Sequence, residues 1–149
     1  LARRVRSLDH EISDLDSDLG YLVEATAPTL VNLFGVGTDV AVQLLVTAGD
    51  NPERLKSSAA FAHLCGVAPV PASSGRTTRH RLNRGGDRHA NAALYRITLC
   101  RLRHDDTTRA YRARRATEQK STQDIIRCLK RYIAREVYQA IRADFQISP

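Results

Sequence analysis

The sequence predicts an all-α fold: a helical domain containing a helix-hairpin-helix-like motif, preceded by a coiled-coil helix. Apolar residues recur at helical spacing along most of the chain, and glycine- or proline-containing breaks separate these runs. Only 5% of the residues are aromatic and none is Trp, so Leu, Val, Ile and Ala must build the core. With 149 residues, the chain is long enough for one core. We assign residues 1–25 to the coiled-coil helix and 26–149 to the helical domain.

Residues 1–25 carry the spacing of a coiled-coil seam. Apolar residues alternate there at steps of three and four: Val5, Leu8, Ile12, Leu15, Leu19 and Leu22. We expect the partner strand upstream in the chain or in a second subunit, which would make the protein a homo-oligomer. An ordinary amphipathic helix lying on its own domain explains the same spacing, because the run covers only about three heptads.

The helix-hairpin-helix-like segment covers about 28–49. Pro28 suits the first turn of a helix that runs through Phe34, the glycines at 35 and 37 break it, and Thr38 can cap a second helix. Glycines in such a hairpin let backbone N–H groups approach a DNA phosphate, so Gly35 and Gly37 are candidate nucleic-acid contacts. A plain helical hairpin with a glycine turn is the alternative.

Four further helices are predicted from the apolar periodicity: 57–64, a long helix capped by Asp87, about 107–118, and about 122–144. In the long helix, Leu99 and Leu102 are expected on the buried side. Two prolines, two glycines and two serines make residues 66–76 a loop or extended segment. We expect no β-hairpin, although residues 77–82 could form a short extended segment.

The positive charge is concentrated in one part of the chain. The net charge is +7, yet residues 72–115 carry twelve Arg against three Asp, a net +9. Such a block attracts polyanions, and Arg forms bidentate pairs with phosphate oxygens, so nucleic acid is the expected partner. Part of the Arg excess is typical of a high-GC genome, but the clustering is not. The candidate nucleic-acid contacts in this block are Arg76, Arg79, Arg81, Arg84 and Arg88.

Several function classes lack support in the sequence. No apolar run approaches the length of a spanning helix, so we expect no membrane partner. The three cysteines lie far apart and at no metal-binding spacing, so zinc is not expected, and their odd number predicts a reducing cytoplasm. We expect no metal or cofactor in this chain. The chain starts at Leu1 and contains no Met, so we expect a fragment of a larger protein.

The segment ASSGR at 72–76 offers a candidate nucleophile. Ser74 precedes Gly75, which removes side-chain crowding, and the arginines that follow could clamp a phosphoryl group. An alcohol attacking a phosphodiester would give a covalent protein-serine–DNA linkage. A flexible turn formed by Ser73 and Ser74 ahead of a basic binding segment explains the same residues without catalysis.

Five motifs occur in a fixed order: L-x-G-V-G at 33–37, L-L-x-x-x-G-D at 44–50, L-C-G-V-A-P at 64–69, S-S-G-R at 73–76 and R-G-G-D-R-H-A-N at 84–91. This order resembles the C-terminal transposase domain of the DEDD insertion-sequence transposases of the IS-one-ten type. These are also called bridge recombinases, because a structured RNA guides them. The resemblance covers residues 30–104.

The resemblance implies a DNA transposase or recombinase domain that binds DNA and guide RNA in the bacterial cytoplasm, associated with the nucleoid. Its nucleophile would be Ser74, with Ser73 as the alternative register. The family has an N-terminal RuvC-like domain with four acidic ligands for divalent metal, expected to be Mg. No counterpart lies in this chain, so the chain alone should bind nucleic acid without recombining it. Arg76 replaces the family's usual second glycine, and that glycine's role is therefore open here.

Two other readings remain. One is a non-catalytic helix-hairpin-helix module that binds nucleic acid, and the other is a coiled-coil adaptor whose basic block only solubilises the surface. A serine–DNA adduct separates the first reading from an enzyme. Binding that is unchanged when the central arginines become Ala would favour the adaptor.

Overall fold

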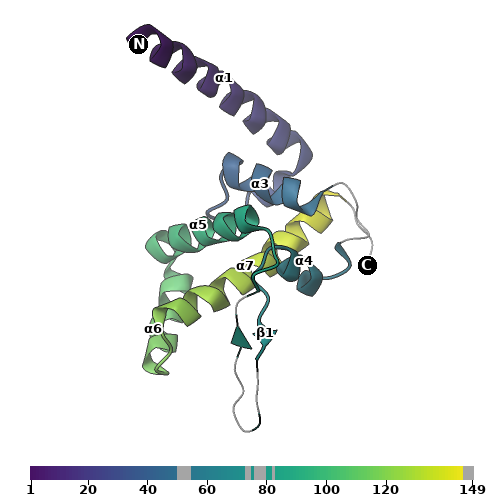
Figure 1. The fold of residues 1–149 in the computed structure, drawn as a ribbon, viewed down its shortest axis with the longest axis vertical. Helices are drawn as coiled ribbons and strands as arrows, with labels where there is room; N and C mark the ends of the chain where they lie inside the picture. Colours follow the sequence, from purple (N-terminus) through teal and green to yellow (C-terminus); the bar gives the residue numbers. More distant parts are fainter. Residues whose placement is uncertain (50–54, 73–74, 76–79, 82, 146–149) are drawn as a thin grey trace.

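The computed structural model describes residues 1–49, 55–72, 75, 80–81 and 83–145 (Figure 1). These residues form seven helices and one two-stranded ladder, so the predicted all-α fold is confirmed. The helices are α1 (Ala2–Thr26), α2 (Pro28–Val31), α3 (Thr38–Ala48), α4 (Ser58–Leu64), α5 (Arg88–His104), α6 (Asp106–Thr117) and α7 (Thr122–Asp144). The strands are β1 (Val70–Pro71) and β2 (His80–Arg81).

Helix α7 lies at the centre of the domain and packs against α2, α4, α5 and α6. Apolar residues recur along it every three or four positions, so one continuous face is buried: Ile125, Leu129, Ile133, Val137 and Ile141. Tyr138 meets Phe61 of α4, with ring centroids 6.3 Å apart, and its hydroxyl donates to the Leu55 carbonyl. This packing fixes α4, and with it the start of the ladder, on the α7 scaffold.

The first hairpin differs from the prediction in two details. Helix α2 ends at Val31, and Phe34 lies in the following turn, where the amide of Val36 donates to the Leu33 carbonyl at 3.0 Å. The N-cap of α3 is Gly37, without a side-chain hydrogen bond, so Thr38 does not cap this helix. Gly35 adopts φ +84° in this turn, a left-handed conformation that favours glycine.

The buried side of α5 also differs from the prediction. Leu99 is 44% exposed, and Thr98 is fully buried in its place. Thr98 continues the stripe set by Leu94 and Ile97, whereas Leu99 lies a further 100° or so around the helix. The Thr98 hydroxyl donates to the Leu94 carbonyl at 2.8 Å, so its burial leaves no polar group unpaired.

Helix α1 projects away from the rest of the domain (Figure 1) and joins it through its C-terminal end, next to α2 and α3. Val23 is the residue that it buries. The six seam residues stay exposed, from 36% at Leu19 to 61% at Leu15. The seam therefore does not pack on its own domain, and the predicted coiled-coil partner stays a prediction.

The expectation of no β-hairpin was wrong. Strands β1 and β2 pair antiparallel, with Val70 opposite Arg81 and Pro71 opposite His80. Proline cannot donate to a ladder, but it is tolerated in a strand with a free edge, and each strand of this two-stranded ladder has one. Among the described residues, none of the helices is both long and apolar enough to cross a bilayer.

Candidate nucleic-acid interface

The junction between α4 and α5 depends on two glycines. A β-carbon on Gly86 would lie 2.1 Å from the Gly66 nitrogen and 2.2 Å from its α-carbon, so only glycine fits at position 86. Immediately after it, the Asp87 amide donates to the Leu64 carbonyl at 2.7 Å. The R-G-G-D motif therefore fastens the start of α5 to the end of α4, between which the ladder emerges.

Asp87 caps α5, as predicted. Its Oδ1 accepts hydrogen bonds from the amides of His89 at 2.7 Å and Ala90 at 3.2 Å, and its Oδ2 accepts from the Thr47 hydroxyl at 2.8 Å. Burial alone would raise the pKa of this carboxyl, but the bonds from Thr47 and the two amides hold the pKa below its ordinary value. One carboxylate thus joins α3 to α5.

Asn91 makes the third connection, to α7. Its Nδ2 donates to the carbonyls of Cys65 at 3.1 Å and Gly66 at 3.0 Å, and its Oδ1 accepts from Lys130 Nζ at 2.7 Å. Burial, and then the charge of Arg127, lowers the pKa of Lys130. The motif at 84–91 is therefore a structural clamp, meaning that its contacts hold α3, α4, α5 and α7 together. These contacts also fix the chain segments just before β1 and just after β2.

A basic pocket of about 520 Å³ lies at the foot of the ladder, between β2 and α7. Six cationic side chains line it: Arg81, Arg115, Lys120, Arg127, Lys130 and Arg131. The remaining walls include the loop from Gly66 to Pro69, Ile125 and Tyr132. We refer to these residues together as the basic pocket.

One carboxylate, Asp124, faces these six cations in the lining. Asp124 accepts hydrogen bonds from the Ser121 hydroxyl at 2.7 Å and from Arg127 at 2.9 Å. The Ser121 bond, and then the Arg127 contacts, lower the pKa of Asp124 despite partial burial, so this carboxyl is ionised at neutral pH. The lining keeps an excess of five positive charges, which favours a phosphate-bearing ligand.

The structure distributes the sequence-predicted site residues unevenly. Arg81 lines the basic pocket, whereas Arg84 and Arg88 are exposed beside the clamp and outside the pocket lining. Four predicted site residues lie outside the described part of the chain: Ser73, Ser74, Arg76 and Arg79. The strand residues before and after these four positions, Pro71 and His80, are paired in the ladder.

Gly35 and Gly37 lie elsewhere. A β-carbon on Gly35 would stand 3.4 Å from the side chains of Ile97 and Cys100, so Gly35 faces α5. Ile97 is nine residues along α5 from Arg88, about 14 Å of helix. Gly37 is exposed, and no atom lies within 4 Å of a β-carbon built on it. Neither glycine is among the residues that line the basic pocket.

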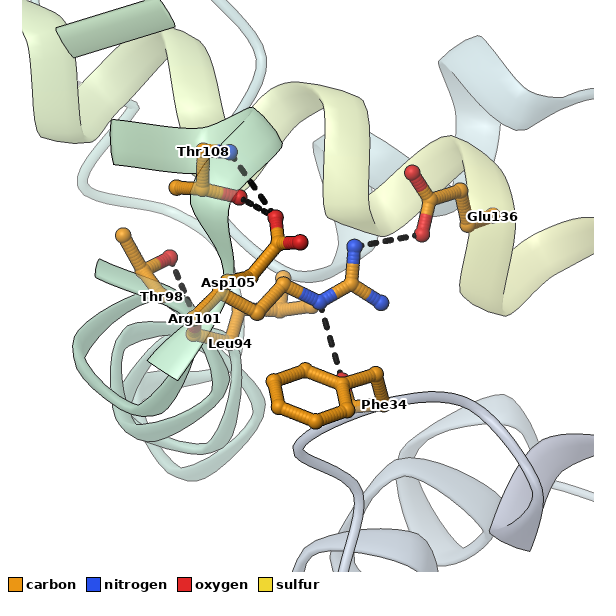
Figure 2. A network of polar contacts seen from close by, with 7 residues as sticks. All are labelled: Phe34, Leu94, Thr98, Arg101, Asp105, Thr108 and Glu136. Carbon is orange, nitrogen blue, oxygen red and sulfur yellow. Dashed lines mark hydrogen bonds and ion pairs between the residues drawn. The ribbon is translucent and has the colours of Figure 1, made fainter. Parts of the chain in front are cut away.

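Arg101, which sequence reasoning did not single out, holds this hairpin turn in place (Figure 2). Its Nε donates to the Phe34 carbonyl at 2.9 Å, and its Nη1 pairs with Glu136 of α7 at 2.6 Å. Its side chain is only 12% exposed. Next to it, Asp105 caps α6 by accepting from the Thr108 amide at 2.8 Å (Figure 2).

The sequence analysis also missed most of the basic pocket, because the other five cationic residues lie 34 residues or more after Arg81 in the chain. The sequence analysis placed the nucleic-acid contacts within residues 72–115, where the positive charge is concentrated. Lys130 and Arg131 follow Arg127 by three and four residues, which places them on the same side of α7 as Arg127. That spacing was the available signal. Among the described ranges, no three His, Cys, Asp or Glu side chains gather as a metal site would require.

Residues 27–113 match the family described as Transposase IS116/IS110/IS902 family. The chain is 30% identical over 134 residues to a Mycobacterium paratuberculosis protein, the insertion element IS900 uncharacterized 42 kDa protein, covering 88% of this chain and 34% of that protein. It is 31% identical over 139 residues to the insertion element IS110 uncharacterized 43.6 kDa protein of Streptomyces coelicolor, covering 90% of this chain and 34% of that protein. The chain thus spans about a third of these relatives.

Proposed function

Since this chain belongs to the IS116/IS110/IS902 family of transposases, we propose that it is the part of a DNA transposase that binds nucleic acid and supplies the attacking serine. In this proposal the Ser74 hydroxyl, or that of Ser73, attacks a phosphodiester. A bond forms between Oγ and phosphorus, and the bond from phosphorus to the leaving strand breaks. The serine proton passes to the leaving oxygen, so that the strand departs with a free hydroxyl end.

The observation that supports this proposal is the pairing of β1 with β2 next to the basic pocket. The ladder brings together the two ends of the segment 72–79, which contains both serines. Arg81, in the ladder itself, lines the basic pocket. A phosphate bound by those guanidinium and ammonium groups would lie close to where the serine-bearing segment leaves the domain, in a field that stabilises negative charge on phosphoryl oxygens.

Other parts of the proposal concern the whole protein. The family resemblance calls for a guide RNA, and for Mg held by acidic residues of an N-terminal domain. The described residues of this chain contain no cluster of acidic side chains that would hold such a metal. We propose that the whole protein acts in the bacterial cytoplasm at the nucleoid, and that this chain alone binds nucleic acid without recombining it.

The alternative of a non-catalytic helix-hairpin-helix module stays a prediction. It needs the turn at 35–37 to face a phosphate. Gly35 faces α5 instead, and Arg101 ties the carbonyl of Phe34 to α7 through Glu136. These contacts give that alternative no support, although the exposed backbone at Gly37 could still touch nucleic acid.

The test uses the full-length transposase, its guide RNA and a labelled DNA substrate. We expect a covalent protein–DNA adduct that survives denaturation and whose modified peptide, identified by mass spectrometry, contains residue 74 or 73. Ser74→Ala or Ser73→Ala should abolish it, while Ser13→Ala on exposed α1 should not. An adduct that persists in the double variant S73A/S74A would refute the serine mechanism.

A further inference from the structure

Two guanidinium groups in the basic pocket have a buried N–H without an acceptor. Arg131 Nη1 and Arg115 Nε are both inaccessible to solvent, and neither has a hydrogen-bond partner among the described residues. Arg115 pairs with Glu118 through a different nitrogen and lies beside the weak acceptor Cys128. Buried donors without acceptors are rare in folded proteins, because they forfeit the hydrogen bonds that water would provide. Both residues line the basic pocket, and hydrogen bonds among the described residues do not fully compensate either guanidinium charge.

None of the neighbouring oxygen acceptors bonds to either nitrogen. Asp124 is already engaged by Ser121 and Arg127, and Glu118 by Arg115. Asn91 directs its only oxygen to Lys130. The pocket therefore has many donors and one engaged carboxylate, the inverse of a cation site and the composition of a phosphate site.

An aromatic ring borders the same pocket. Tyr132 lines it and is 51% exposed. Tyr111 meets Tyr132 edge to face, with centroids 5.8 Å apart and an interplanar angle of 83°. In that geometry Tyr111 supports the ring of Tyr132 without covering both of its faces. Exposed, supported aromatic rings next to cations are the stacking platforms that bind unpaired bases.

We propose that the basic pocket binds one unpaired nucleotide of a nucleic-acid strand, with its phosphate on Arg131 and Arg115 and its base stacked on Tyr132. This deepens the proposed function, on which it rests for the class of ligand. Volume agrees with this ligand, since about 520 Å³ lies within the usual range for pockets that take a nucleotide-sized molecule. A regular duplex keeps its bases stacked inside and would engage only the cations.

The test measures binding of the 149-residue chain to fluorescent oligonucleotides by anisotropy. The probes are a single-stranded DNA, an RNA of the same sequence, and the corresponding DNA duplex, each titrated at several salt concentrations. The DNA and RNA arms distinguish the two sources of an unpaired nucleotide, because only RNA offers a 2′-hydroxyl. Circular dichroism melting confirms that each variant is folded.

Arg131→Met keeps the aliphatic stem and removes the guanidinium. We expect it to weaken binding to the preferred single strand about tenfold, and to reduce the slope of log affinity against log salt by about 0.7. Tyr132→Ala should weaken single-strand binding about tenfold while changing duplex binding less than twofold, and Tyr132→Phe should bind like the unsubstituted chain. The matched control is Arg135→Met, one turn further along α7, which is exposed and outside the pocket lining.

Two results would overturn the proposal that the basic pocket binds an unpaired nucleotide. One is equal weakening by Arg131→Met and Arg135→Met, which would indicate general electrostatics. The other is a Tyr132→Ala variant that loses duplex and single-strand affinity alike, or loses neither. In both cases nucleic-acid binding by the chain would stand. If the unsubstituted chain binds none of the three probes, the proposed nucleic-acid function and the pocket fail together. The binding assay requires no strand cleavage, so its outcome is independent of the serine-adduct experiment.

Discussion

Gly86 touches Gly66 backbone to backbone, and a β-carbon on Gly86 would come within 2.1 Å of the Gly66 nitrogen. The neighbouring Gly85 is different, since a β-carbon there would meet only Asn83 Oδ1, at an ordinary 3.5 Å. The two glycines of one motif therefore have unequal roles.

Gly86→Ala should lower the free energy of unfolding by about 3 kcal/mol or more, because backbone atoms must move to admit the methyl group. Gly85→Ala should change it by less than about 1 kcal/mol. Urea denaturation followed by circular dichroism measures both. Similar stability of the two variants would contradict the close contact at position 86.

Asp87→Ala should cost about 1 kcal/mol at neutral pH, the usual value of an N-cap side chain. Because the folded-state pKa of Asp87 lies below its ordinary value, this stabilisation is complete above about pH 4 and is lost as the pH falls through the lowered pKa. Urea denaturation of both proteins across the acid range should show the difference shrinking at low pH. Asp39→Ala, in the first turn of α3, is the control and should have a smaller effect at neutral pH. A difference that grows on acidification would contradict the assignment.

Arg101→Ala should destabilise the domain by about 2 kcal/mol, since it removes a mostly buried guanidinium that bonds the Phe34 carbonyl and Glu136. Glu136→Ala should cost less, because it leaves the bond to Phe34 in place. A double-mutant cycle measures the coupling between Arg101 and Glu136, which we expect to be about 1 kcal/mol. Zero coupling would show that the ion pair contributes nothing. Arg103→Ala, at an exposed position of the same helix, should be near neutral.

Ile12→Asp should weaken self-association of the chain, if α1 forms the predicted coiled coil with a second subunit. Ile12 is 55% exposed, so in the isolated chain the substitution should leave the unfolding of the helical domain unchanged. Sedimentation velocity at increasing concentration measures association. Ser13→Asp adds the same charge next to the seam and is the control. A chain that stays monomeric at every concentration would remove the second subunit as the partner.

Local patterns accounted for most of the helices. The boundaries of α7 agree with the prediction because its apolar repeat is long and its cap, Ser121, precedes it directly. Asp87 was recognisable as a cap for the same reason. Leu99 was misplaced because a polar residue, Thr98, can be buried when its hydroxyl bonds the preceding turn, and composition does not reveal this.

The candidate site was harder to predict, because it is made by packing between distant segments. Arg81 lines the same pocket as Arg115 and Arg131 only because β2 lies beside α7 in the folded domain. Gly35 shows a second difficulty, since a glycine needed for contact with α5 has the same signature in the sequence as one that approaches a phosphate. Two-residue strands are too short for a period to be visible.

The ladder also affects which insertions into the sequence the helical domain can tolerate. Val70 pairs with Arg81 and Pro71 with His80, so the connection between the two strands is closed at the ladder. Doubling the length of a connection closed in this way costs only about 0.6 kcal/mol. Insertions into this connection should therefore cost the helical domain little free energy of unfolding, even where they displace the serines from their working position.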